Sequence, residues 1–180
     1  MKKLIVVVVT FFGGCSFHSS QLDFIRDLFS SEEGPKPNWE VHWSEGVTEA
    51  SYAINVGAEV WFANSDGLLI KFDGWQIFET ASSKNDASDT FIKMRDNELE
   101  IYSSNNWSEI FRCGEWTSTR KANMMLLHKQ SCNNSSGENN FSNFILVNSI
   151  GEIVEMSFKY HPFREKVTVR ATNFSSGSLL

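Results

Sequence analysis

The alternation of apolar and polar residues with a period of two constrains this fold more than any other feature of the chain. It begins where Trp39, Val41 and Trp43 alternate with Glu40 and His42, as in a strand with one buried and one solvated face. A helix would instead require a repeat of about 3.6 residues. Further short runs rich in β-branched and aromatic residues predict strands at 50–56, 59–63, 68–72, 75–79, 90–95, 98–103, 107–114, 120–130, 144–147, 152–160 and 165–172.

Turn-forming residues separate these runs. Asn64-Ser65-Asp66-Gly67 and Asp73-Gly74 supply the positive φ that tight hairpins require, and such short connections pair neighbouring strands antiparallel. A similar motif lies at 148–151, but we interpret both as ordinary hairpins, because a propeller needs at least four blades of about 40 residues. The polar stretch 131–140 predicts a mobile loop. We therefore expect an all-β domain of about ten strands, an antiparallel meander sheet folded over into a barrel or sandwich.

The N-terminus has the order of an export signal. Two lysines precede the apolar run 4–12, and Gly13-Gly14-Cys15 follows. The run is too short for a spanning helix, which takes about 20 apolar residues. A cysteine directly after two glycines resembles the bacterial lipobox, in which the thiol is acylated. We predict that a lipid is attached at Cys15. The alternative is an ordinary secretory signal, in which case the position of Cys15 is incidental. By resemblance to known lipoproteins, Ser16 favours sorting to the outer membrane, on its periplasmic face.

One folded domain is expected after the signal. We assign 1–14 to the signal peptide, 15–20 to a lipidated tether, 21–174 to a single β-rich periplasmic domain and 175–180 to a flexible tail. Within the domain, Ser20 followed by Asp23 forms a capping pattern at the start of a short amphipathic helix over 21–29. We expect this helix to pack on the domain, because its polar face lacks the lysines typical of membrane-surface helices.

Charge and cysteine content restrict the partners and the compartment. Without Lys2 and Lys3 the mature chain has 14 basic and 22 acidic side chains, a formal charge of −8, which disfavours binding to nucleic acid. Cys113 and Cys132 remain as an even pair in an exported chain, so we expect a disulfide between them. Two separately buried thiols are the alternative. Neither cysteine has a second ligand at the spacing of a metal site.

The sequence contains no specific catalytic motif. The histidines are scattered, and nucleophile elbows, phosphate-binding glycine loops and zinc motifs are absent. We therefore predict that the protein is not an enzyme and needs no cofactor and no metal. The six tryptophans are the unusual feature, since aromatic faces stack on sugars or line acyl pockets. We interpret Trp39 and Trp43 as core residues and take Trp107 and Trp75 as candidate glycan or lipid contacts, with Trp107 expected to be the most exposed.

Several stretches, in order along the chain, resemble the GfcB/YjbF type of outer-membrane lipoproteins from group 4 capsule and exopolysaccharide operons. They are a first helix ending in Leu-Phe, a strand followed by a glycine turn and Leu-Leu-Ile-Lys, and a closing Asn-Ser-Ile-Gly turn that leads to a serine and a proline, at 23–29, 60–72 and 148–172. The chain departs from the family in its shorter length and in Asn148, where Asp is usual.

The resemblance implies a folded-over antiparallel meander that faces the periplasm and supports polysaccharide export or assembly. It implies membrane attachment through the lipid anchor and contacts with export or assembly proteins or with the glycan, and it carries over no catalytic residues. A lipid or lipoprotein carrier of the LolB kind, or an envelope scaffold, is the alternative. A carrier should have a dry aromatic cavity, whereas an assembly factor should have a filled core.

Overall fold

The computed structural model describes residues 37–84, 89–103, 107–121, 124–137, 139–162 and 166–173. The predicted signal peptide, the lipid-acceptor cysteine, the tether, the helix over 21–29 and the tail at 175–180 lie outside these residues. The described residues form thirteen strands: β1 (Trp39–His42), β2 (Thr48–Val56), β3 (Glu59–Ala63), β4 (Leu69–Phe72), β5 (Ile77–Ala81), β6 (Thr90–Arg95), β7 (Glu98–Ser103), β8 (Ser108–Cys113), β9 (Thr117–Arg120), β10 (Leu126–Asn134), β11 (Asn140–Val147), β12 (Ile153–Lys159) and β13 (Lys166–Ala171).

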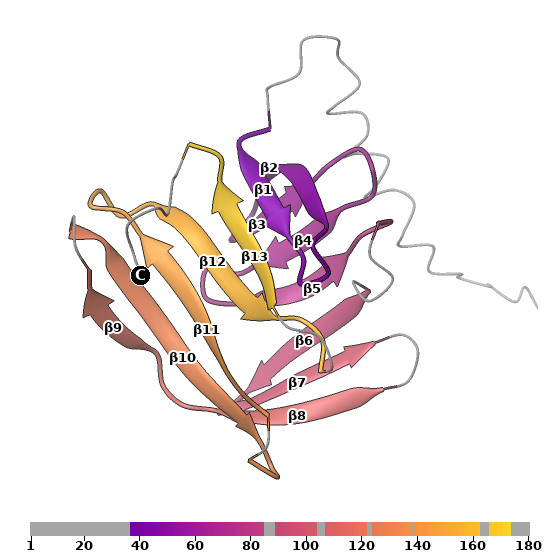
Figure 1. The fold of residues 1–180 in the computed structure, drawn as a ribbon, viewed down its shortest axis with the longest axis vertical. Helices are drawn as coiled ribbons and strands as arrows, with labels where there is room; N and C mark the ends of the chain where they lie inside the picture. Colours follow the sequence, from indigo (N-terminus) through magenta and orange to yellow (C-terminus); the bar gives the residue numbers. More distant parts are fainter. Residues whose placement is uncertain are drawn as a thin grey trace, which may run out of the picture.

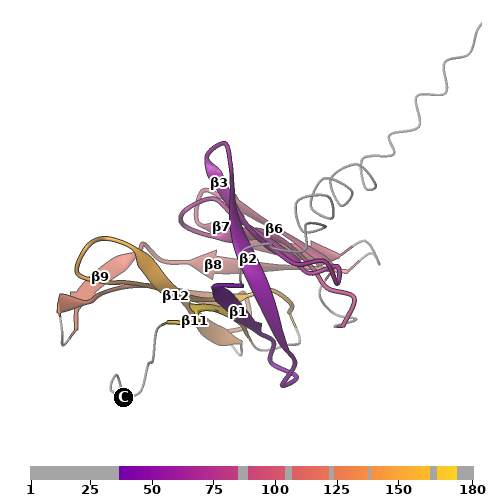
Figure 2. The same ribbon diagram turned by 90° about the horizontal axis from the view of Figure 1, so that it is seen from above.

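Twelve of the strands close into an antiparallel barrel (Figure 1). Strands β1 to β8 form a meander, β8 pairs with β10, and β10 to β13 lead back to β1. The remaining strand, β9, pairs with the N-terminal part of β10 and lies at the end of the molecule away from β2 and β3 (Figure 2). Closure gives every strand of the ring a neighbour on both sides, which shortens the free edges along which open sheets associate. The predicted all-β, antiparallel fold is confirmed.

The turns form as the glycine and asparagine pattern predicts. Gly67, between β3 and β4, has a φ of 95°, and Gly74, between β4 and β5, has a φ of 102°. In the first turn the Asn64 side-chain oxygen accepts hydrogen bonds from the backbone N–H groups of Asp66 and Leu68, at 2.9 and 3.0 Å. Asn64 thus accepts hydrogen bonds from the backbone N–H groups of the turn, and Gly67 adopts the left-handed backbone conformation that the turn requires.

Two predictions around β10 are wrong. The stretch 131–140 is a loop only in its middle, since β10 runs through Asn134 and β11 begins at Asn140, and the two strands pair across eight registered positions. The predicted strand over 120–130 is interrupted, because β9 ends at Arg120 and the chain turns before β10 begins at Leu126. At 131–134 polar residues lie on a solvated strand face, where low hydrophobicity does not indicate a loop.

Large aromatic side chains fill the barrel interior. Phe72 on β4 and Phe158 on β12 come from strands that are not neighbours in the ring, and their ring centroids are 6.0 Å apart. Trp43 meets Tyr160 at 5.1 Å in an edge-to-face contact. Trp43 is buried and Trp39 packs against the same core. The interpretation of these two tryptophans as core residues is confirmed.

Candidate functional site

The disulfide joins two strands of the ring that share few registered pairs. Strands β8 and β10 pair at three positions, and Cys113 and Cys132 are directly opposite each other at the first of them. Their sulfur atoms are bonded at 2.02 Å, with a sequence separation of 19. Both residues are buried in the main core. The predicted bridge between Cys113 and Cys132 is therefore present in the structure, and it adds a covalent link where few backbone hydrogen bonds close the barrel. We refer to this junction as the β8–β10 seam.

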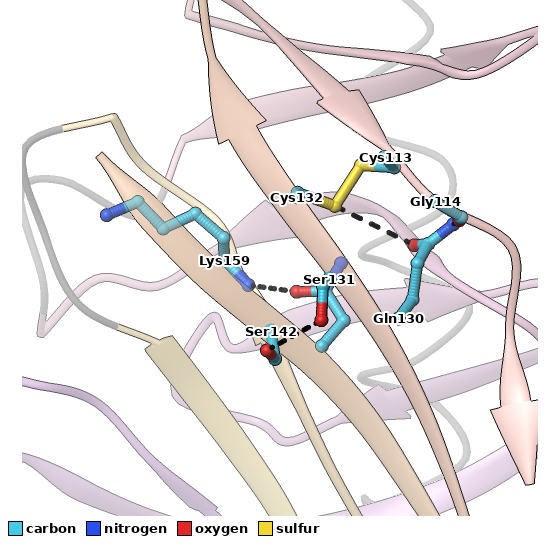
Figure 3. Close-up of a disulfide and its surroundings, with 8 residues drawn as sticks. Cys113, Gly114, Gln130, Ser131, Cys132, Ser142 and Lys159 are labelled. Carbon is cyan, nitrogen blue, oxygen red and sulfur yellow. Dashed lines mark hydrogen bonds between the residues drawn. A yellow bond between two sulfur atoms is a disulfide. The ribbon is translucent and has the colours of Figure 1, made fainter. Parts of the chain in front are cut away.

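Polar groups on both faces of the sheet surround the bridge (Figure 3). On the core side Gln130 donates a hydrogen bond from its amide nitrogen to the carbonyl of Gly114, at 3.1 Å. Residues alternate in direction along a strand, so Ser131 faces away from the core and meets Ser142 of β11, with 3.4 Å between their hydroxyl oxygens. Strand β10 thus directs the disulfide toward the core and polar side chains toward the outer surface.

Trp75 is the exposed member of an aromatic cluster at one end of the barrel. It lies in the turn between β4 and β5, with 52% of its surface exposed. Its ring centroid is 5.4 Å from that of His128 on β10 and 5.7 Å from that of Trp116, and Trp116 reaches the core ring of Phe158 at 6.2 Å. A half-exposed indole held by other rings is a rigid platform of the kind on which a sugar ring stacks.

Trp107 does not have the exposure that the sequence suggested. It is half-buried against the core and its ring centroid lies 4.4 Å from that of His161. The two preceding asparagines led to the wrong expectation, because the indole turns inward from the start of β8. Trp107 still lines a surface hollow of about 340 Å³, together with Lys93, Glu100, Tyr102, Ser103 and Ser108. The structure does not bring Trp75 and Trp107 into contact or into this one hollow.

A buried carboxylate was not anticipated from the sequence. Glu49 on β2 is 2% exposed, and one of its oxygens accepts hydrogen bonds from the Trp43 indole N–H at 2.8 Å and from the Ser82 hydroxyl at 2.6 Å. Its other oxygen and the buried hydroxyl of Ser51 have no hydrogen-bond partner within the part of the chain that the structure describes. The sequence held no signal for this burial, because the apolar residues Tyr52, Ile54 and Val56 of β2 alternate with the face that carries Glu49.

Comparison with known proteins identifies the fold. The barrel is similar to the crystal structure of the hypothetical lipoprotein YmcC from Escherichia coli K12. The two share 12% sequence identity with a TM-score of 0.52, and the match covers 82% of this chain and 93% of YmcC. No protein-family model and no curated protein matches the sequence. At this identity the similarity to YmcC establishes a common fold.

One ion pair of the described residues shifts the pKa of both its members. The Lys84 ammonium lies 2.9 Å from an Asp66 carboxylate oxygen, and this hydrogen bond, together with the opposite charge, lowers the pKa of Asp66 and raises the pKa of Lys84. Within the described ranges, no group of three or more His, Cys, Asp or Glu side chains could hold a metal ion. In the same ranges no helix has the length and apolar character needed to cross a membrane.

Proposed function

We propose that this chain is an outer-membrane lipoprotein, attached through Cys15 on the periplasmic face. It acts without catalysis, as a binding or scaffolding protein that assists the assembly or export of capsule or exopolysaccharide. Its contacts with export proteins or glycan would be made by the surface of the barrel. Three observations support the attachment: the lipobox-like sequence at 13–15, the disulfide, which suits an oxidising compartment, and the fold shared with a protein described as a lipoprotein.

The filled barrel interior is the observation that carries the choice of role. A carrier of acyl chains needs an empty apolar cavity large enough for its cargo. Here Phe72 and Phe158 meet across the middle of the barrel, and Phe111, Met156 and Tyr160 are also fully buried. The interior favours a protein that works through its surface over a carrier of the LolB kind.

Two measurements on cells test the proposal. Incorporation of labelled palmitate should occur in the wild type and disappear in Cys15→Ser, while Ser19→Ala, a change of similar size in the same tether, should label normally. Surface polysaccharide should fall in a deletion strain and return with the wild-type gene but not with Cys15→Ser. Equal labelling of wild type and Cys15→Ser would refute the anchor. Unchanged polysaccharide in the deletion strain would refute the role.

The carrier alternative has its own readout. The full chain, purified from membranes in a neutral detergent, can be denatured and its non-covalently bound lipids identified by mass spectrometry. The filled core predicts less than one acyl chain per protein beyond the covalent anchor. A stoichiometric amount of free acyl cargo would overturn the proposed role in favour of carriage.

A further inference from the structure

A second apolar cluster lies on the outer face of the barrel wall. Along β3, Val60 and Phe62 belong to the main core, and because side chains alternate in direction along a strand, the residues between and beside them point outward. The strand registers bring outward residues of β2, β3, β4 and β5 together on this face. The buried centre and the residues packed against it, which we name the outer cluster, are Trp61, Ala63 and Leu69 with Ile54, Val56 and Ala81.

The outer cluster is shielded from solvent to the degree of a core. Trp61 is 9% exposed, Leu69 8% and Ala63 0%. Lys71 shares this face, and its side chain is only 11% exposed, although a lysine on an outer sheet surface normally keeps its ammonium group in water. Burial of this extent on an outward face requires a layer of residues that covers it.

The polar groups of this face are paired with one another. The Trp61 indole N–H donates to Glu59 at 2.8 Å. The Lys71 ammonium lies 2.6 Å from a Glu79 carboxylate oxygen and 4.9 Å from the centre of the Trp61 ring. Such pairing offsets the cost of withdrawing the charges from water. The surface that a covering segment meets is therefore mainly apolar, and the segment should present an apolar stripe.

The described strands do not supply this cover. All thirteen belong to one sheet, and the strand outside the ring, β9, pairs with β10 and lies away from β2 and β3 (Figure 2). The burial arises within a single chain, so a second copy or another protein is not its source. The covering segment is therefore part of this chain and lies outside the described residues.

Residues 21–29 fit the outer cluster in pattern, length and position. Nine residues of helix are about 14 Å long, and the three inter-strand spacings from β2 to β5 also total about 14 Å. Residues 30–38 can span up to about 30 Å when extended, whereas β3 lies two strands, about 10 Å, from β1. The apolar side chains of the segment recur at helical spacing and share one face: Leu22, Ile25, Leu28 and Phe29.

Two other segments with several apolar residues lie outside the described residues, and neither fits as well. The run 4–12 belongs to the predicted signal peptide and is absent from the mature chain. In the tail at 174–180, Ser-Ser-Gly-Ser separates Phe174 from the two final leucines, which interrupts any helical stripe.

We propose that residues 21–29 pack on the outer cluster as an amphipathic helix and hold this side of the barrel toward the membrane. Only residues 16–20 separate the helix from Cys15, and five residues span at most about 18 Å. Strands β10 and β11 lie halfway round the ring from β3 and β4, so they would face the periplasm and its partners. The docking is independent of the anchor, whereas the orientation rests on the lipid attachment of the proposed function.

Acetylation with an N-hydroxysuccinimide ester, followed by mass spectrometry, tests the docking in the mature chain purified in a neutral detergent. Lys71 should react at least about tenfold more slowly than Lys93, which is exposed on β6. Leu22→Ser with Ile25→Ser, the apolar-face variant, removes two apolar contacts and should raise the rate at Lys71 about tenfold or more. The amides of β12, elsewhere in the ring, should stay protected from exchange, which separates loss of docking from unfolding.

Matched controls identify the segment and the face responsible. Arg26→Ser with Asp27→Ser alters the polar face of the same helix, and removal of 174–180 deletes the tail. Each control should change the rate at Lys71 by less than about twofold. Equal rates at Lys71 and Lys93 in the wild type, no rise in the apolar-face variant, or a rise on removal of the tail would each refute the docking.

The orientation has a separate readout in vesicles that hold the anchored protein and nitroxide-labelled lipid headgroups. With Cys15 acylated and the Cys113–Cys132 bridge formed, an introduced cysteine is the one free thiol for a fluorophore. The label on Ala58→Cys, in the turn between β2 and β3, should lose more fluorescence than the label on Ser131→Cys of β10. Equal or reversed losses would refute the orientation. If palmitate still labels Cys15 while the docking test fails, this inference is overturned and the proposed anchor stands.

Discussion

Removal of the Cys113–Cys132 disulfide should destabilise the barrel by about 3 kcal/mol. The bridge joins residues with a sequence separation of 19, and the chain-entropy model gives about 3 kcal/mol for a closed loop of roughly 20 residues. Domains of this size unfold with a free energy of about 5–15 kcal/mol, so the loss is a large fraction of the total. Replacement of both cysteines by alanine is the appropriate change, because a serine hydroxyl at either buried position would add its own desolvation cost.

The effect should be concentrated at the β8–β10 seam. Strands β8 and β10 share three registered pairs, those of Cys113, Arg112 and Phe111 with Cys132, Asn133 and Asn134, whereas β10 and β11 pair at eight positions. Without the bridge, the seam keeps three registered pairs, fewer than every other ring junction of the described residues except β5–β6, which has two. Amide protection there should fall more than protection in the β2–β3 hairpin, which keeps all its partners.

Equilibrium unfolding in urea, with the oxidised wild type beside Cys113→Ala/Cys132→Ala, gives the magnitude. At an m-value of about 1–3 kcal/mol/M the midpoint should move by about 1–3 M. Hydrogen exchange measured by mass spectrometry gives the location. A stability change under about 1 kcal/mol, or exchange that accelerates equally throughout the barrel, would refute the reasoning from loop closure at a weak seam.

Three further changes have defined expectations. Glu49→Ala should lower the free energy of unfolding in urea by about 1–3 kcal/mol, because the Trp43 indole and the Ser82 hydroxyl lose their acceptor. Ser51→Ala should leave that free energy unchanged or raise it, because the buried hydroxyl of Ser51 has no partner among the described residues. A larger loss in Ser51→Ala than in Glu49→Ala would contradict both expectations. Trp75→Ala should cost only about 1 kcal/mol, since 52% of the ring surface is already exposed, and a loss near that of a core indole would show a structural role. Lys84→Gln should return the pKa of Asp66 toward 3.8 in an NMR titration. The paired carboxylate favours folding only while it is ionised, so its contribution to stability is lost as the pH falls through the lowered pKa. An Asp66 titration that is the same in wild type and Lys84→Gln would exclude the pairing in solution.

The fold class could be predicted because one signal is repeated along the whole chain. Period-two alternation from Trp39 onward, with glycine turns such as Asp73-Gly74, specifies short strands in antiparallel order. The choice between a closed barrel and a sandwich could not be made from the sequence, because closure depends on the pairing of β1 with β13, from opposite ends of the described chain. Local periodicity contains no information about which distant strands meet.

The error at 131–140 had a signal that could have prevented it. Asn134-Ser135-Ser136-Gly137 repeats the Asn-Ser-X-Gly motif of 64–67 and 148–151, and it forms the same kind of turn. Gly137 donates its N–H to the Asn134 carbonyl at 3.1 Å, as Gly151 does to Asn148. Composition indicated a loop because every outward residue here is polar. A search for repeated turn motifs would have identified a third hairpin.

The candidate site was less predictable, because it depends on residues from separate elements. Cys113 and Cys132 meet through the pairing of β8 with β10, and Trp75 meets Trp116 and His128 from other parts of the chain. Strand β10 carries Cys132 inward and Ser131 outward. The disulfide therefore also holds β10 against β8. Loss of the bridge should consequently speed amide exchange at Gly114, whose N–H donates to the Ser131 carbonyl at 2.8 Å, and unchanged exchange there in Cys113→Ala/Cys132→Ala would show that the neighbouring pairings hold β10 in place without the bridge.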